Sequence, residues 1–223
     1  MTDRYSQAPQ PSYRLIPSRF PPIGLFDSVS TAADLDAVMD LAGWTNDRLV
    51  ADRIARLPQS EWVHGRPNAS IVMAAFLHVA PGGTRFNGPE LGAWYAAADL
   101  STAAAEVGHH LRREAVARSV PGMTRTYRCY SARLAGSYLD IRGQQAELAD
   151  VYAPDSYAAS QVFGERIRAS RETGIVYDSV RYRGGVNAVA YRPSMVLEVV
   201  QADHFEITVT ATNRRIEVRR LAA

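Results

Sequence analysis

The chain has 223 residues, of which 47% are hydrophobic and 22% are charged, and its formal net charge at pH 7 is +2. This length is enough to bury a sizeable core, and the composition is that of an ordinary globular protein. So small a net charge gives no indication of a nucleic-acid or membrane-surface partner, and no apolar run is long enough to span a bilayer.

Two residue types narrow the chemistry further. Cys129 is the only cysteine, so neither an intramolecular disulfide nor a thiolate zinc cluster can form. All 25 basic residues are arginine, which excludes a Schiff-base lysine and the lysine of a phosphate-binding P-loop. Any bound phosphate must then be held by arginine, hydroxyl or backbone N–H groups. The polar, proline-bearing start has no apolar leader, and we expect a cytoplasmic protein.

The N-terminal part of the chain alternates extended and helical patterns. Five prolines within residues 1–22 predict an extended arm. Apolar spacing from about 30 to 57, interrupted by Gly43, predicts two helices. The short apolar segment IVMAAFLHV, residues 71–79, is expected to form a buried strand. A glycine-rich loop follows, and LGAWYAA predicts a second strand.

The C-terminal part contains the clearest helix, predicted for residues 101–118 with Asp99 or Ser101 as its N-cap. Alternating patterns in TRTYRCYSARL and SYLDIR predict two strands. A helix is expected over about 155–170, followed by the strand-like segments GIVYDSV, AVAYR, SMVLEVV and HFEITVTA. The ending RRIEVRR alternates apolar and charged residues, which favours a solvated edge strand over a nucleic-acid contact. The expected fold is a single α+β domain with a helical N-terminal region.

An arginine, a tyrosine and a glutamate follow one another in the middle of the chain. Arg85 lies in a loop with glycines on both sides, Tyr95 lies in the next strand, and Glu106 lies in an alanine-rich helix. The small neighbours of Glu106 would let a ligand approach its carboxylate closely. The alternative is a solvated helix carboxylate that pairs with Arg112 or Arg113, and the pattern alone leaves both open.

Two further polar groups give weaker signals. Glu106, His109 and His110 form E-x-x-H-H, which resembles half of a dinuclear metal site. Such a site needs a second matching motif, the sequence has none, and we expect no metal. Ser179 follows an apolar strand beside Arg181, without the G-x-S-x-G pattern of a nucleophilic serine. Its hydroxyl could bind phosphate or cap its own turn.

Together these residues resemble the RES-domain family, named for its Arg, Glu and Ser. The family shows a glycine-rich loop with G-G-x-Arg-aromatic-Asn, then a Tyr ten residues after the Arg, then a Glu at the head of a helix. In this chain GGTRFN occupies residues 82–87, with one inserted Thr and with Phe as the aromatic residue, and Tyr95 and Glu106 follow.

Two more matches extend the resemblance along the chain. GIVYDSVR, residues 174–181, matches the family's Gly-Ile-Val-x-x-Ser-x-Arg. The early Tyr13 and Arg14 resemble its opening aromatic-Arg pair. The resemblance covers about residues 13–200, with the motifs in the family's order.

The resemblance implies a fold similar to that of ADP-ribosyltransferases. It divides the chain into an extended arm (1–22) and a RES-like catalytic domain (23–223) with a helical insertion (28–60). It also implies an NAD-degrading toxin of a bacterial toxin–antitoxin pair, which acts by phosphorolysis or hydrolysis. The implied partner is a small helical Xre-like antitoxin, and a homodimer within that complex is one possible arrangement. NAD is then a substrate, inorganic phosphate is a possible co-substrate, and no cofactor is expected.

The resemblance also assigns roles to five residues. Cleavage of the nicotinamide–ribose bond passes through an oxocarbenium-like transition state, which the carboxylate of Glu106 would stabilise. Arg85 would hold pyrophosphate or an attacking phosphate, Tyr95 would stack on a ring of the dinucleotide, and Ser179 would bond phosphate. Arg14 is a candidate for a second phosphate clamp. The alternatives are a mono-ADP-ribosyltransferase that acts on a host protein and a non-catalytic RES-fold scaffold.

Overall fold

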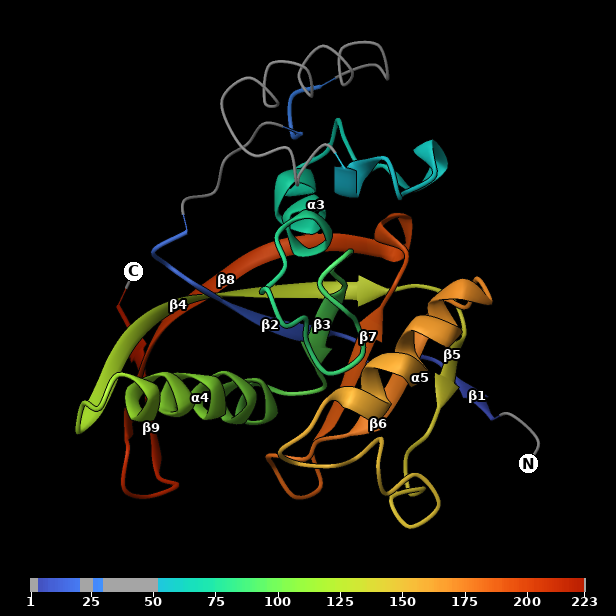
Figure 1. The fold of residues 1–223 in the computed structure, drawn as a ribbon. Helices are drawn as coiled ribbons and strands as arrows, with labels where there is room; N and C mark the ends of the chain where they lie inside the picture. The colour runs from blue at the N-terminus through green and yellow to red at the C-terminus, as the bar shows by residue number, and fades with distance from the viewer. Residues whose placement is uncertain (1–3, 21–25, 30–51, 223) are drawn as a thin grey trace.

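A nine-stranded sheet forms the centre of the protein in the computed structural model, which describes residues 4–20, 26–29 and 52–222 (Figure 1). Across the sheet the strands follow the order β1-β5-β6-β7-β3-β2-β4-β8-β9. Of the described pairs, β5–β6 is parallel and the rest are antiparallel. The strands are β1 (Tyr5–Ser6), β2 (Ser12–Pro17), β3 (Trp94–Ala97), β4 (Gly122–Leu134), β5 (Tyr138–Asp140), β6 (Gly174–Asp178), β7 (Val186–Ala190), β8 (Val196–Thr210) and β9 (Ile216–Leu221). The architecture is one mixed α/β domain.

Helices cover both faces of this sheet. They are α3 (Ala69–Leu77), α4 (Leu100–Ala117) and α5 (Ala158–Ala169), with short 3₁₀ turns η1 (Gln59–Glu61) and η2 (Pro193–Met195). Trp94 and Ala96 of β3 pack with α3, whereas Ala97 packs with α4. Because successive strand residues point to opposite faces, α3 lies on one face and α4 on the other. α5 shares the α4 face, because it packs against Ile175 and Val189, whose chain neighbours face α3.

The segment 71–79, expected to be a strand, forms most of helix α3, and that prediction is wrong. Five of its apolar side chains are buried: Ile71, Val72, Met73, Phe76 and Leu77. A helix buried on nearly every side has no polar stripe, so periodicity cannot distinguish it from a buried strand. Its start is also set from a distance, because the carboxylate of Asp27 accepts from the N–H groups of Asn68 (3.2 Å) and Ser70 (2.7 Å).

The expected N-terminal arm is extended but contributes two strands to the sheet. β2 lies between β3 and β4, and it pairs with β4 at six positions. With β3 it pairs only at Tyr13↔Ala97, so the sheet opens between β2 and β3 beyond that point. Most of the helical insertion expected over 28–60 lies outside the described residues, since residues 30–51 are not among them.

The helix predicted for 101–118 is confirmed as α4, and Asp99 is its N-cap, since its carboxylate accepts from the Thr102 N–H at 2.8 Å. The helix expected over 155–170 and the edge strand expected from RRIEVRR are confirmed as α5 and β9. Most of the segments SMVLEVV and HFEITVTA forms the single long strand β8, whose pairing with β4 contains two register shifts. No helix in the described ranges is long and apolar enough to cross a membrane.

Candidate functional site

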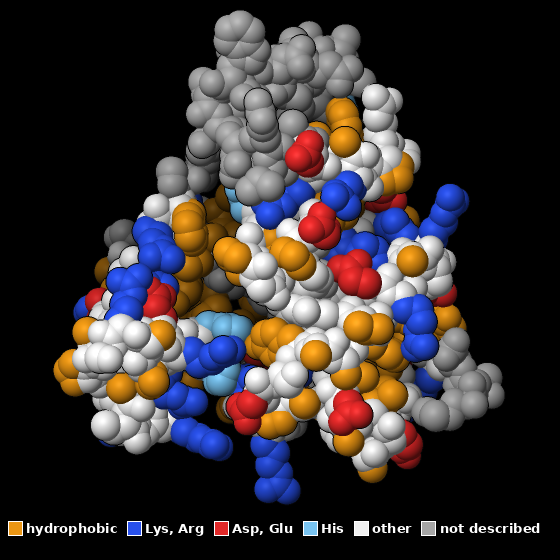
Figure 2. Space-filling model, viewed as in Figure 1, with side chains coloured by type: hydrophobic (Ala, Val, Ile, Leu, Met, Phe, Trp, Pro, Cys, Tyr) orange, Lys and Arg blue, Asp and Glu red, His pale blue; other side chains and the backbone are white. Residues whose placement is uncertain are grey.

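A pocket of about 240 Å³ lies where the sheet opens, on the face covered by α4 and α5. In Figure 2 the surface is hollowed beside α4, and histidine and arginine side chains lie at the edge of the hollow. Four of the five residues singled out from the sequence line this pocket: Arg14, Arg85, Tyr95 and Glu106. The fifth, Ser179, makes a hydrogen bond with Glu106. Five residues far apart in the chain therefore meet at one place.

Glu106 is held through one of its two carboxylate oxygens. Its Oε1 accepts from the Ser179 hydroxyl at 2.7 Å and from the Asn187 side-chain amide at 2.8 Å. No described residue makes a hydrogen bond with Oε2 or an ion pair with this carboxylate. The alternative of a solvated helix glutamate paired with Arg112 or Arg113 does not describe this arrangement, because the side chain is half-buried and lines the pocket.

Ser179 combines a turn contact with its bond to Glu106. Its Oγ accepts from the backbone N–H groups of Arg181 (3.1 Å) and Tyr182 (3.0 Å). A hydroxyl has one proton, and here that proton is donated to Glu106. The turn-capping alternative is therefore present, and Ser179 orients Glu106. A bond from Ser179 to a substrate phosphate would require this proton to turn away from the carboxylate.

Arg85 is held by main-chain groups. Its side chain belongs to a residue only 8% exposed, and Nη1 donates to the carbonyls of Val151 (3.3 Å) and Ala153 (3.0 Å). The guanidinium carbon lies 4.9 Å from the ring centroid of Tyr157, a cation–π contact. Glycine is required at Gly83 of this loop, because its φ is +69° and an added Cβ would lie 2.2 Å from the Asn87 carbonyl oxygen. Two main-chain carbonyls and an aromatic ring outside the glycine loop thus hold the side chain of this arginine.

Tyr95 fastens the same loop. Its hydroxyl accepts from the Phe86 N–H at 2.9 Å and donates to Asn87 Oδ1 at 2.9 Å. Burial raises the pKa of Tyr95 to about 12, so the hydroxyl stays protonated and can make both contacts. The ring lines the pocket, while the hydroxyl determines where the loop that carries Arg85 lies.

Arg14 reaches the pocket through the gap between β2 and β3. Its Nη1 donates to the Tyr95 carbonyl at 2.9 Å, and its guanidinium carbon lies 4.9 Å from the ring centroid of Trp94. Burial lowers the pKa of Arg14 to about 10, which leaves it protonated at neutral pH. No carboxylate of the described part of the chain pairs with it, so its positive charge is available to a ligand.

Three pocket residues were not found from the sequence: Tyr157, Tyr177 and Asn187. Tyr177 is 5% exposed, and burial raises its pKa well above the ordinary tyrosine value. Asn187 gave a usable signal, because it is the one polar residue in the apolar strand VNAVA. Nothing in the local sequence distinguishes Tyr157, which reaches Arg85 only through the packing of the loop before α5.

Helix α4, which carries Glu106, also carries two neighbouring histidines. His110 lines it, and the His109 and His110 rings make an edge contact with centroids 5.4 Å apart. Burial, followed by the nearby Arg181, lowers the pKa of His109 to about 3, so this imidazole is neutral at physiological pH. In the described ranges no group of three or more His, Cys, Asp or Glu side chains could hold a metal ion.

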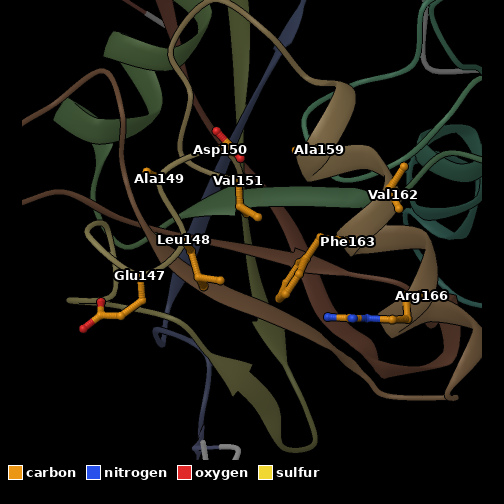
Figure 3. A pocket seen from close by; sticks show the side chains of 9 residues that line it. All are labelled: Glu147, Leu148, Ala149, Asp150, Val151, Ala159, Val162, Phe163 and Arg166. Atoms are coloured by element: carbon orange, nitrogen blue, oxygen red, sulfur yellow. The ribbon is translucent and has the colours of Figure 1, made fainter.

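A larger pocket of about 510 Å³ lies between the segment 147–151 and α5 (Figure 3). The apolar side chains of Leu148, Val151 and Phe163 point into the space between these two elements. Charged groups do not converge there as they do around Glu106, and a few convergent polar groups are what distinguishes a binding site. The carbonyl of Val151, which lines this larger pocket, accepts from Arg85.

Comparison with known proteins identifies the family. The family model of the RES domain matches residues 53–210. The chain belongs to the RES domain family. The matched part of this RES domain contains Arg85, Tyr95, Glu106 and Ser179, whereas Arg14 precedes it.

A solved structure, the crystal structure of the M.tuberculosis MbcT-MbcA toxin-antitoxin complex, contains a chain similar to this RES domain protein at 20% sequence identity. The similarity covers 55% of this chain and 73% of that chain, with a TM-score of 0.40. No match was found among curated proteins.

Proposed function

We propose that this RES domain protein cleaves the bond between nicotinamide and ribose in NAD. The observation that carries the proposal is the carboxylate of Glu106, which is oriented through Oε1 and leaves Oε2 to a ligand, in a pocket that also presents two arginines. The charges of these three groups are not paired with one another in the described structure. A ligand with both a cationic centre and anionic groups would complement them.

NAD has this charge pattern. Its nicotinamide ring is cationic, and the ring leaves as a neutral molecule, so no general acid is needed. The ribose then develops oxocarbenium character, and an adjacent carboxylate stabilises it electrostatically. Arg85 keeps Nε and Nη2 without hydrogen bonds to described residues, and a guanidinium edge of this kind suits phosphate oxygens. The rings of Tyr157 and Tyr177 supply flat walls for the heterocycle.

An experiment with purified protein would identify the group that accepts the ribosyl group. We propose phosphate or water, and incubation with NAD in the presence and absence of phosphate separates them. ADP-ribose 1″-phosphate with free nicotinamide would indicate phosphorolysis, and ADP-ribose in both conditions would indicate hydrolysis. Label transferred from NAD to protein would instead support a mono-ADP-ribosyltransferase. If folded protein released no nicotinamide at all, the non-catalytic scaffold would replace the proposal.

Membership of the RES family supports a biological role as a toxin neutralised by a small helical Xre-like antitoxin. We further propose a fold related to that of ADP-ribosyltransferases, which agrees with a pocket at the opening of a large sheet. Expression of the chain alone in a bacterial host should stop growth as cellular NAD falls, and co-expression of the neighbouring gene should restore growth. Unchanged growth and NAD with folded protein present would contradict the toxin role.

A further inference from the structure

The polar side chain of Asn187 stands out in its surroundings. It is 3% exposed, and the three strand residues that follow it, Ala188, Val189 and Ala190, have no exposed surface. A buried amide without a hydrogen-bond partner is costly. Its Nδ2 donates to Glu106 Oε1 at 2.8 Å, so the carboxylate on α4 is the partner that this amide finds.

The sheet determines that Asn187 faces α4. In register it lies opposite Ala97 of β3 on one side and Tyr177 of β6 on the other. Side chains directly opposite one another share a face of the sheet, and Ala97 packs with α4. Ala97 is small, and Ala103 of α4 is small as well, so Asn187 and Glu106 can meet across this part of the interface.

The chemistry of the pair allows only one orientation of the amide. Both oxygens of an ionised carboxylate are acceptors, so only the N–H₂ end of Asn187 can face it. Ser179 donates to the same oxygen from the loop that connects β6 and β7. Two donors from different elements therefore hold Oε1 in place, and no described residue makes a hydrogen bond with Oε2. Both donors are neutral, so neither forms an ion pair with Glu106.

We propose that Asn187 is a positioning residue that orients Glu106 toward the ribose, and that its neutral amide adds no second charge beside the carboxylate on which cleavage depends. The proposal rests on the proposed function for its catalytic consequence, but not for the position of the carboxylate. The other titratable groups near Glu106 are His110 of its own helix and Tyr177 of β6, with Arg85 beside both. Asn187 differs from these groups because its side chain does not titrate and makes a direct hydrogen bond with Glu106.

Two substitutions test separately the hydrogen bond that Asn187 donates and the absence of charge on its side chain. Asn187→Leu removes the hydrogen bond at similar volume, and kcat should fall on the order of 100-fold, as for a misplaced catalytic group. KM should stay within about threefold, because the interaction that is lost acts in the transition state. Asn187→Asp places a second carboxylate against Glu106, so that the two must share a proton at low pH. The acid limb of its pH–rate profile should move upward by about one pH unit or more.

Asn68→Asp is the matched control. Asn68 also donates its side-chain amide to a fixed acceptor, the Val199 carbonyl at 2.9 Å, but it precedes α3 on the opposite face of the sheet. The substitution is the same and likewise removes a hydrogen bond donated by a side-chain amide, here to a neutral carbonyl. Its pH–rate profile should match that of the unmodified protein, which shows that a lost amide bond alone does not move the profile.

A readout without turnover separates this proposal from the proposed function. The carboxyl carbon of Glu106, assigned by its loss in Glu106→Gln, is followed by ¹³C NMR during a pH titration. Its midpoint should rise in Asn187→Asp and stay constant in Asn68→Asp. An unchanged midpoint in Asn187→Asp, or wild-type kcat in folded Asn187→Leu, would overturn the positioning role. A raised midpoint in a protein that releases no nicotinamide would uphold the placement of Glu106 and reject the proposed reaction.

Discussion

The pocket and the β1–β5 edge of the sheet hold their charged side chains in opposite ways. At the edge, Asp140 bonds Arg4 at 3.0 Å and Arg142 at 2.6 Å, so each of these charged side chains lies in an ion pair. In the pocket, Glu106 is held by a hydroxyl and an amide, and Arg85 by two carbonyls and an aromatic ring. Charges held by neutral groups remain unpaired, which suits a site that must bind and stabilise a charged ligand.

The largest effect is expected for Glu106→Gln. Glutamine keeps an oxygen that can accept from Ser179 and Asn187, so the fold should be retained, while the negative charge is lost. Removing one electrostatic contribution of this kind costs about 3 kcal/mol, or roughly 100-fold or more in rate. Nicotinamide release measured beside the thermal midpoint of unfolding tests this. Normal turnover in the variant would place Glu106 outside the chemistry.

Arg85→Lys should be nearly as damaging as Arg85→Ala. A lysine can supply the charge, but it cannot bond two carbonyls, stack on Tyr157 and offer a second edge to phosphate. The loss in kcat/KM should be about 10- to 100-fold for both, since a charge-assisted hydrogen bond contributes about 1.5–3 kcal/mol. Steady-state kinetics with NAD decide the question. A lysine variant that retains most of the activity would mean that only the charge of Arg85 matters.

Tyr95→Phe tests whether the loop that carries Arg85 depends on one hydroxyl. The change leaves the Phe86 N–H and a lone pair of Asn87 without their partner, which should lower the free energy of unfolding by about 1–3 kcal/mol and raise KM. Tyr130→Phe is the control, because its hydroxyl bonds Gln201 at 2.9 Å on the α3 face. Urea unfolding should show a loss in both variants, whereas KM should change only for Tyr95→Phe. An equal rise of KM in both would contradict the loop role.

The smallest effect on activity is expected at the sheet edge, where stability should depend on pH. Burial by itself would raise the pKa of Asp140, but its hydrogen bonds with Arg142 and Arg4 outweigh this and lower the pKa below the ordinary value of 3.8. Because the pKa of Asp140 is lower in the folded state, this carboxylate stabilises the protein above about pH 3.8. The stabilisation is lost as the pH falls through the pKa of the folded state. Asp140→Asn should flatten this acid dependence of the unfolding free energy. Turnover at neutral pH should be unchanged in this variant. A large loss of turnover would contradict the view that the ion pairs at the sheet edge serve stability and not activity.

Much of the site could be predicted from sequence because its residues lie in ordered motifs. Arg85, Tyr95, Glu106 and Ser179 follow the spacing of the RES family, and they meet at one pocket together with Arg14. Their contacts differ from the expectation. The Tyr95 hydroxyl fastens the loop and the Ser179 proton is donated to Glu106, because each hydroxyl takes the nearest strong partner within the fold. Motif spacing identifies such residues but carries no information on which partner each proton takes.

The sequence by itself determined the elements whose signals are local: α4 with its Asp99 cap, α5, and the alternating strands of the C-terminal half. Only the tertiary structure decided that residues 71–79 are helical, that β2 lies inside the sheet, and that Asn187 meets Glu106. The physical reason is the same in each case. Helix α3 is buried on nearly every side, β2 pairs with distant strands, and the amide of Asn187 finds its partner 81 residues away. Each depends on groups remote in the chain, which no local pattern records.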